Sequence, residues 1–151
     1  MIVFKCKPFN SLSLDELLSI LALRSEVFVV EQNCVYQDID GKDKKALHIV
    51  GYLNEEIVAY ARIFDQGVIY PEYCSIGRIV ISFTERGKKF GHQLVEFSRK
   101  QCHKSFNGGS IKISAQAHLE KFYGLHGFYA SGETYLEDGI PHIGMLLSNS
   151  F

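Results

Sequence analysis

The sequence has almost no net charge and no long apolar run. Its 16 lysines and arginines are offset by 17 aspartates and glutamates, which leaves a formal net charge of −1. Such a balance gives no sign of nucleic acid or an anionic membrane as a partner. No apolar segment reaches the roughly 18 residues that a membrane-spanning helix needs. We therefore expect a protein that acts without nucleic acid and without a membrane.

Cysteine pairs and metal-binding spacings are absent as well. The four cysteines, at positions 6, 34, 74 and 102, include no Cys-x-x-Cys pair, so reduced thiols are expected. The six histidines show neither His-x-x-x-His nor His-Glu-x-x-His spacing, and no zinc site is expected. The first residues lack the charged and then apolar layout of a signal peptide. These observations predict a cytoplasmic protein without a bound metal.

One cluster of aspartates could be taken for a calcium-binding loop. Asp38, Asp40 and Asp43 lie close together in a polar stretch. A calcium loop would need an oxygen ligand where Lys42 stands, and Gly41 is out of register for the turn of such a loop. We interpret the cluster as a solvated acidic loop.

Local patterns predict one domain over residues 1–151. Ser13 and Glu16 have the spacing of a capping box before a helix, and Asp138-Gly139 is typical of a tight hairpin turn. Strands in a run, with helices inserted between them, favour an α+β fold around one mixed, mainly antiparallel sheet flanked by helices. The expected strands are residues 2–7, 47–53, 57–64, 76–81, 110–115, 130–136 and 140–147, and the expected helices are residues 14–28, 90–106 and a short one after residue 116.

Residues 74–92 are the most informative stretch. A β-branched run is followed by a short basic loop and then by an amphipathic helical pattern. The N-terminus of a helix presents free N–H groups and the positive end of the helix dipole. Gly87 and Gly91 allow a ligand to approach the main chain, and Arg86, Lys88 and Lys89 add positive charge. The stretch therefore predicts a site for a diphosphate.

Two common phosphate loops do not fit this stretch. The P-loop spacing G-x-x-x-x-G-K-[ST] is missing, and so is the dinucleotide fingerprint G-x-G-x-x-G. Arg86 and Gly91 instead match the ends of the pattern Gln/Arg-x-x-Gly-x-Gly/Ala, with Lys89 in place of the middle glycine. By itself the loop fits an ordinary solvated helix start equally well.

A second motif downstream decides between these interpretations. Gln116 and Tyr123 are seven residues apart, and a Gly-Phe pair follows at positions 127 and 128. Together the two motifs resemble those of the GNAT superfamily of N-acetyltransferases. The similarity to the ElaA-like branch of that superfamily extends over nearly the whole chain. The resemblance implies a GNAT-like twisted sheet that is splayed between its two central strands.

The resemblance also implies the chemistry and its partners. We expect an acyl-CoA-dependent N-acyltransferase that moves acetyl from acetyl-CoA to a primary amine by direct attack in a ternary complex. The acceptor would be a small molecule or a protein amine, and acidic residues in the open loop and the last hairpin favour a cationic one. A homodimer is expected by analogy. The cofactor-binding residues expected on this basis are Ile79, Val80, Ile81, Arg86, Gly87, Lys88, Lys89, Phe90, Gly91, His92 and Gln116.

Tyr123 is the predicted catalytic residue. Its counterpart in the superfamily lies near the CoA sulfur and acts as general acid, and a phenol is a reasonable donor to a departing thiolate. The alternative is that Tyr123 packs in the core beside Phe122 and Phe128. The general base stays open between a water molecule and four side chains, which are Glu31, His48, Glu85 and His142.

Two alternative functions stay open. The first is a non-catalytic module of the same fold that binds or senses acyl-CoA, which would bind CoA without turning over any amine. The second is a nucleotide-binding protein with an unrelated phosphate loop. It would be stabilised by ATP or NAD but not by CoA.

Overall fold

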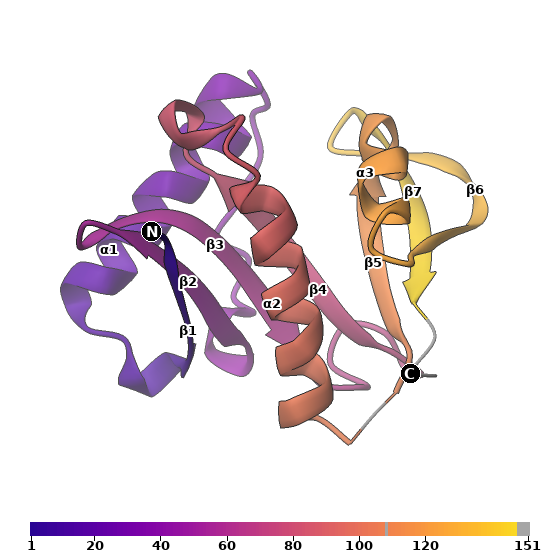
Figure 1. The fold of residues 1–151 in the computed structure, drawn as a ribbon. Helices are drawn as coiled ribbons and strands as arrows, with labels where there is room; N and C mark the ends of the chain where they lie inside the picture. The colour runs from indigo at the N-terminus through magenta and orange to yellow at the C-terminus, as the bar shows by residue number, and fades with distance from the viewer. Residues whose placement is uncertain (108, 148–151) are drawn as a thin grey trace.

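The computed structural model describes residues 1–107 and 109–147. In this part of the chain, seven strands form one twisted sheet in the order β1-β2-β3-β4-β5-β7-β6 (Figure 1). Only the central pair β4 and β5 is parallel among them. The predicted α+β class with a mixed, mainly antiparallel sheet is confirmed. The strands are β1 Val3–Pro8, β2 Leu47–Leu53, β3 Glu56–Phe64, β4 Cys74–Ile81, β5 Ile111–Gln116, β6 Tyr129–Glu137 and β7 Ile140–Leu147.

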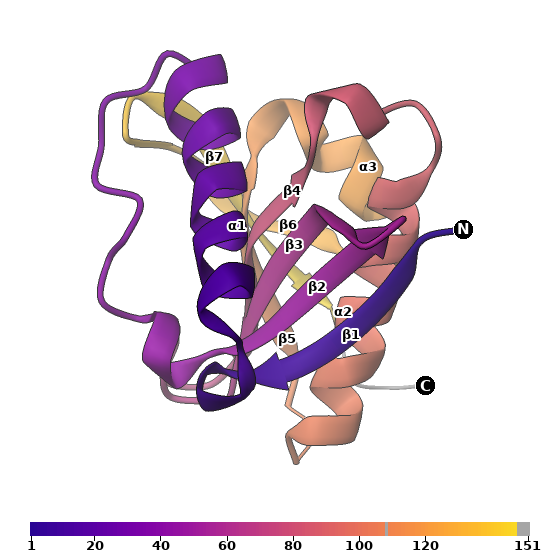
Figure 2. The same cartoon turned by 90° about the vertical axis from the view of Figure 1, so that its left-hand side faces the viewer.

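The helices cover both faces of the sheet. Helix α1, Leu14–Arg24, packs on one face, and α2, Phe90–Ser105, packs on the other (Figure 2). The short α3, Glu120–Gly124, follows β5. A π-helical segment, Ser25–Glu31, continues α1. No helix in the described residues is both long and apolar enough to cross a bilayer.

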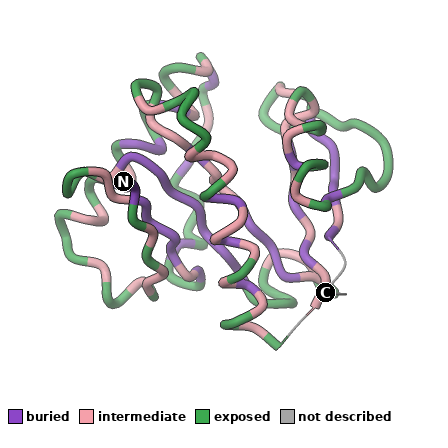
Figure 3. The backbone as a smooth tube through the Cα atoms, in the orientation of Figure 1, coloured by how far each residue is buried: buried purple, intermediate pink, exposed green. Residues whose placement is uncertain are grey.

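The alternation of side chains along the strands produces two cores. On β2, Ile49 packs in the core under α2, and the next residue, Val50, packs in the core under α1. The same alternation on β3 sends Ala59 and Ala61 to the α2 side and Tyr60 to the α1 side. Figure 3 shows that burial is concentrated in the central strands, whereas the edge strand β6 is exposed along its whole length.

Helix α1 begins as expected but buries a different face. Ser13 Oγ accepts from the Glu16 N–H at 3.0 Å, and Glu16 Oε1 accepts from the Ser13 N–H at 2.9 Å, so the predicted capping box is confirmed. The expected apolar face included Leu14 and Leu18, but these side chains are 86% and 69% exposed. The buried line starts at Ile20. At about 100° per residue, positions 14 and 18 lie on the far side of the helix from it.

The sheet splits between its two central strands. β4 and β5 pair only at Cys74 with Ile111 and at Ser75 with Lys112. Beyond these two pairs the strands diverge, and the gap between them widens towards α3 (Figure 1). The edge of β4 that faces β5 therefore keeps its backbone groups available for a ligand.

Gly51 marks a close contact in the core. A Cβ atom at this position would lie 2.7 Å from Ala59 Cβ and 2.8 Å from Phe4 Cε1. We expect Gly51→Ala to lower the free energy of unfolding by about 1–3 kcal/mol, because the strands must shift to admit the methyl group. Urea denaturation measures this loss. The matched control is Gly124→Ala, where nothing lies within 4 Å of the added methyl. Equal stability of the two variants would contradict the prediction.

Candidate functional site

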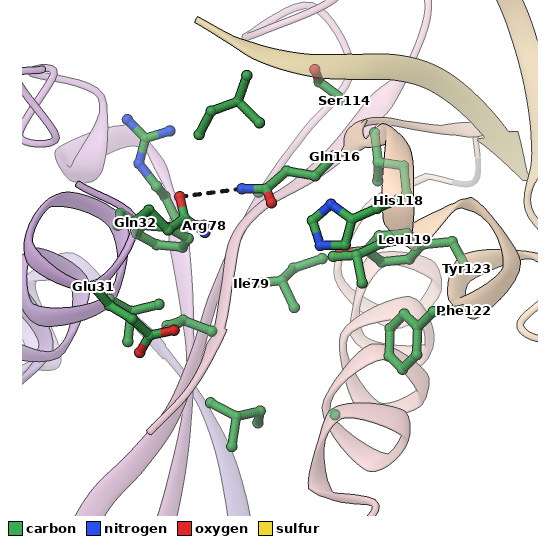
Figure 4. Close-up of a pocket in the computed structure, with 18 of the residues that line it drawn as sticks. Glu31, Gln32, Arg78, Ile79, Ser114, Gln116, His118, Leu119, Phe122 and Tyr123 are labelled. Carbon is green, nitrogen blue, oxygen red and sulfur yellow. Dashed lines mark hydrogen bonds between the residues drawn. The ribbon is translucent and has the colours of Figure 1, made fainter. Parts of the chain in front are cut away.

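The split in the sheet opens into a cavity of about 650 Å³. This volume is typical of a pocket for a cofactor or a drug-sized ligand. Its walls come from β4 and β5, the π-helical segment, the start of α2, the α3 region and the turn between β6 and β7. Figure 4 shows labelled side chains from the π-helical segment and the residue after it, from β4 and β5 and from the α3 region around the gap. The cavity therefore gathers residues from both halves of the chain.

The start of α2 forms one end of the cavity. Gly87 and Lys89 both have left-handed backbone conformations, with φ of 79° and 66°, and they turn the chain sharply into the helix. The N–H of Gln93 already bonds to the Lys89 carbonyl oxygen at 3.3 Å. The N–H groups of Phe90 and Gly91, in the first helical turn, therefore have no carbonyl within the helix to bond to. This end of the cavity is suited to an anion.

Two of the three predicted cations lie at this end of the cavity. Arg86 and Lys89 line it, but Lys88 does not. Lys88 Nζ instead lies 2.7 Å from a carboxylate oxygen of Glu85. The structure thus turns Lys88 away from the contact that the sequence predicts, because the neighbouring carboxylate holds its side chain outside.

Arg86 is held across the mouth of the cavity. Its two Nη atoms donate to the Glu31 carboxylate at 2.6 and 3.0 Å, and its Nε donates to the Ile81 carbonyl at 3.2 Å. Both side chains of the ion pair are about a third exposed, so the pair can open at low cost. An incoming anion would compete with Glu31 for this guanidinium.

The strand β4 offers its backbone to the middle of the cavity. The Ser82 N–H donates to the Val58 carbonyl of β3 at 2.8 Å. Since N–H groups alternate along a strand, that of Ile81 faces the split. Residues 79–81 all line the cavity.

A bulge distorts β4 next to these residues. The register between β3 and β4 slips between Tyr60 and Arg62, and Arg78 takes a left-handed conformation with φ of 51°. The Arg78 guanidinium is anchored by Asp38, with Nε 2.7 Å from Oδ1. Bulges of this kind bend a strand and re-aim its backbone beside functional sites.

Tyr123 both packs in the core and reaches the cavity. Its ring meets Phe122 edge-on at 5.1 Å and Phe128 at 6.1 Å, and the side chain is 6% exposed. It also lines the cavity, and no hydrogen bond to its hydroxyl is found within the described residues. Burial raises the pKa of this phenol, so the hydroxyl keeps its proton at neutral pH.

Gln116 spans the split. Its Nε2 donates to Gln32 Oε1 at 3.3 Å, which joins the end of β5 to the residue after the π-helical segment (Figure 4). The two amides form a polar bridge across the cavity between its two walls.

Comparisons with known proteins identify the family. The model of the acetyltransferase (GNAT) domain matches residues 13–148. The chain belongs to the GNAT family. It is 46% identical over 138 residues to the protein ElaA of Escherichia coli K12, with 90% of each chain covered. It is 42% identical to a UPF0039 protein of Synechocystis, with 91% of this chain and 90% of the relative covered.

Solved structures agree with this membership. An acyl-CoA N-acyltransferase from Pseudomonas aeruginosa superposes with a TM-score of 0.92 at 41% identity and covers 98% of this chain and 100% of its own. E. coli ElaA gives a TM-score of 0.91 at 43% identity, with the same coverage. The predicted membership of the GNAT superfamily and of its ElaA-like branch is confirmed.

The structure also explains the unusual GNAT loop. The position of the middle glycine in the usual motif is occupied by Lys89, whose φ is 66°. Glycine is common where the backbone must be left-handed, because its lack of a Cβ removes the steric cost. The lysine adopts the left-handed conformation at that steric cost.

The four candidate bases differ in whether they line the cavity. His48 is 1% exposed and does not line the cavity; its ring nitrogens lie 2.6 Å from the Tyr60 hydroxyl and 2.8 Å from the Asp43 carbonyl oxygen. Burial lowers the pKa of His48 and keeps it neutral. Three of the four candidates line the cavity, namely Glu31, Glu85 and His142.

The prediction of a solvated acidic loop is wrong for two of the three aspartates, since Asp38 and Asp43 are buried and Asp40 alone is exposed. Asp38 and Asp43 are each 7% exposed. Both are bound by Arg24, the fully buried last residue of α1, whose Nε donates to Asp38 at 2.9 Å and whose Nη1 donates to Asp43 at 2.8 Å. Burial of charged groups requires such pairing. The arginine lies far from the loop in sequence, and local polarity could not reveal it.

Two further arginines complete this buried network. Arg62 of β3 donates to both oxygens of Asp40, at 2.9 and 2.6 Å, and to Asp43 at 2.9 Å. Hydrogen bonding to Arg62 holds the pKa of Asp40 well below its usual range. Arg78 joins through Asp38. The network fixes residues 33–45 against the sheet.

Sequence reasoning missed the wall formed by the π-helical segment. Val27, Phe28 and Gln32 line the cavity from this segment or from the residue that follows it. Two bonds of the π-helical type, from the Gln32 N–H to the Val27 carbonyl and from the Cys34 N–H to the Val29 carbonyl, widen the helix here. π-Helical turns occur frequently at functional sites. The sequence carries no marker for this widening. The buried ion-pair network did have a signal, because an arginine within an apolar run, such as Arg62, indicates a buried acidic partner.

Proposed function

We propose that the protein transfers an acyl group, in the first place acetyl, from acyl-CoA to a primary amine by direct attack within a ternary complex. The observation that carries the proposal is the anion-binding turn at the start of α2, which opens directly into the split of the sheet. We propose that residues 1–151 act as one GNAT domain in the cytoplasm, where the free thiols of its four cysteines stay reduced.

Each part of the co-substrate has matching groups in the cavity. The pyrophosphate binds the amides of residues 87–92, helped by Arg86 and Lys89. The pantetheine lies along residues 79–81 and pairs with the free edge of β4 as an added strand would. Gln116 lies beside this path, since it lines the same stretch of cavity. These groups fit an extended, anionic molecule such as acetyl-CoA.

The remaining groups act on the thioester. A backbone N–H of β4 polarises the thioester carbonyl as the amine attacks. Tyr123 then gives its proton to the departing sulfur. Tyr123 lines the cavity, and it enters the reaction protonated because burial raises the pKa of its phenol.

Calorimetry with acetyl-CoA tests the binding part of the proposal. The expected result is saturable binding at one site, together with a rise in Tm at saturating co-substrate. Release of free thiol from acetyl-CoA with a panel of amines then tests the transfer. Binding without turnover of any amine would favour a non-catalytic module that binds acyl-CoA. Stabilisation by ATP or NAD but not by CoA would favour an unrelated nucleotide site.

Arg86→Glu should weaken acetyl-CoA binding. The variant removes a cation from the phosphate end and sets a second carboxylate opposite Glu31. We expect the dissociation constant to rise at least about tenfold, which corresponds to roughly 1.4 kcal/mol. Calorimetry measures the change.

Lys88→Glu is the matched control for this charge reversal. It makes the same change in net charge two residues away, but its side chain lies outside the cavity. Its effect on the dissociation constant should be clearly smaller. Wild-type affinity in Arg86→Glu, or equal effects of the two variants, would remove Arg86 from the site.

A further inference from the structure

His142 has a fixed tautomer at the wall of the cavity. It lies on β7, is 7% exposed and lines the cavity. Its Nδ1 is 2.7 Å from the Ile140 carbonyl oxygen. A carbonyl oxygen only accepts hydrogen bonds, so Nδ1 carries a hydrogen. The other ring nitrogen, Nε2, is left to accept or to hold a second proton.

A carboxylate faces that second nitrogen. His142 Nε2 lies 3.3 Å from Glu137 Oε2. The other oxygen of Glu137 accepts from Ser114 Oγ at 3.1 Å. Two acceptors that face each other at this distance repel unless a hydrogen lies between them. The pair therefore binds one proton, or in its place the N–H of a ligand.

The groups around His142 are acidic or uncharged. Tyr135 of β6 stacks on its ring at 6.3 Å, and Asp138 lines the cavity at the adjoining turn. Gln116 of β5 stands opposite His142 in the strand register. No cation from these elements, β5 to β7, is found beside His142 within the described residues. An ammonium ion would therefore meet a negative and proton-accepting corner of the cavity.

We infer that His142 is the base that takes the proton from the acceptor amine, and that Glu137 is the positioning residue that docks its ammonium. The inference rests on the proposed transferase function and names its acceptor class, a cationic primary amine. The ammonium N–H replaces the proton between Nε2 and Oε2. This assigns the step to one of the four candidate bases, because Glu31 and Glu85 lie beside Arg86 and Lys88 at the phosphate end of the cavity and His48 lies outside the cavity.

All protons and bonds are accounted for in the acyl-transfer step. His142 Nε2 removes one proton from the ammonium, and the neutral nitrogen attacks the thioester carbon. The C–N bond forms, and the C–S bond breaks as Tyr123 gives a proton to sulfur. The attacking amine nitrogen then loses a second proton, which returns to Tyr123 in place of the proton that Tyr123 gave to sulfur. One proton per turnover thus leaves His142 for solvent.

His142→Gln tests the base directly. We expect kcat/KM for the amine to fall by about 100-fold or more, while the dissociation constant of acetyl-CoA stays at the wild-type value. The rising acidic limb of the pH profile of kcat/KM should disappear as well. His103→Gln is the matched control, since His103 lies on α2 and does not line the cavity. The control variant should keep the wild-type kcat/KM for the amine and the acidic limb of its pH profile.

Glu137→Gln tests the docking residue without a risk to the fold, because this side chain is 47% exposed. KM for a cationic amine should rise, because the ammonium loses its carboxylate partner. Glu133→Gln, a change on the same strand outside the cavity, should leave KM unchanged.

Two outcomes would overturn the inference. One is a wild-type pH profile of kcat/KM in His142→Gln, and the other is an unchanged KM for the cationic amine in Glu137→Gln. Either result leaves acetyl-CoA binding and turnover by the wild-type protein intact. Failure of the transferase function itself would show earlier, as a wild-type protein that binds no CoA or acetylates no amine.

Discussion

Tyr123→Phe should lower kcat by about 100-fold or more, because the departing thiolate loses its proton donor. The dissociation constant of acetyl-CoA should stay at the wild-type value, since the aromatic ring and its packing are kept. Stability should also be nearly unchanged, because within the described residues the hydroxyl makes no hydrogen bond that the variant would break. Steady-state kinetics by thiol release, together with calorimetry, separates these effects.

Tyr129→Phe is the control for the loss of a phenolic hydroxyl. Tyr129 is 56% exposed on β6 and does not line the cavity. The kcat of the Tyr129→Phe variant should therefore match that of the wild type. If Tyr123→Phe turned over at the wild-type rate, Tyr123 would be a core residue only. The proton would then reach the sulfur from water or from another group.

Arg24→Ala should destabilise the fold by roughly 3–5 kcal/mol, because it removes the fully buried cation that two buried carboxylates share and leaves Asp43 with Arg62 and Asp38 with Arg78. Arg24 is fully buried, and its guanidinium binds Asp38 through Nε and Nη2 and Asp43 through Nη1. For a chain of this length, the loss corresponds to a fall in Tm of roughly 6–20 °C. Thermal unfolding followed by circular dichroism measures it.

Lys44→Ala gives the matched control for the loss of a cation near the same loop. Lys44 is exposed, and its removal should change Tm little. A Tm for Arg24→Ala close to that of the control would show that the aspartates reach water and that the network does not hold the loop. Acetyl-CoA added at saturation should recover part of the lost stability of Arg24→Ala, since the loop carries Cys34 and Tyr36 at the cavity wall.

The prediction of the fold depended on signals that are local in the chain. The capping box at Ser13, the short gap between the strands expected at residues 47–53 and 57–64, and the Asp138-Gly139 turn each fix one junction by short-range hydrogen bonds or backbone preference. The junctions in turn fix which strands are neighbours. The apolar face of α1 was predicted less well, because leucines at positions 14 and 18 are compatible with a helical stripe whether or not a sheet lies beneath them.

The candidate site was predicted in part for the same reason. The turn at residues 86–91 is local, so glycine positions and charge already indicate an anion site. Lys88 shows the limit of this reasoning, since the side chain lies beside Glu85 and outside the cavity. Composition gives the charge of a loop but not the direction in which each side chain points.

The sequence by itself determined the strands and helices, their order and the basic turn, because these depend on neighbours within a few residues. Only the tertiary structure decided the π-helical wall, the burial of Asp38 and Asp43 and the pairing of His142 with Glu137, whereas the family resemblance already implied the split between the two central strands. Each of these joins residues that are brought together by the twist and register of the sheet. The physical reason is that burial and charge pairing are properties of the packed chain, whereas capping and turn preferences belong to short segments.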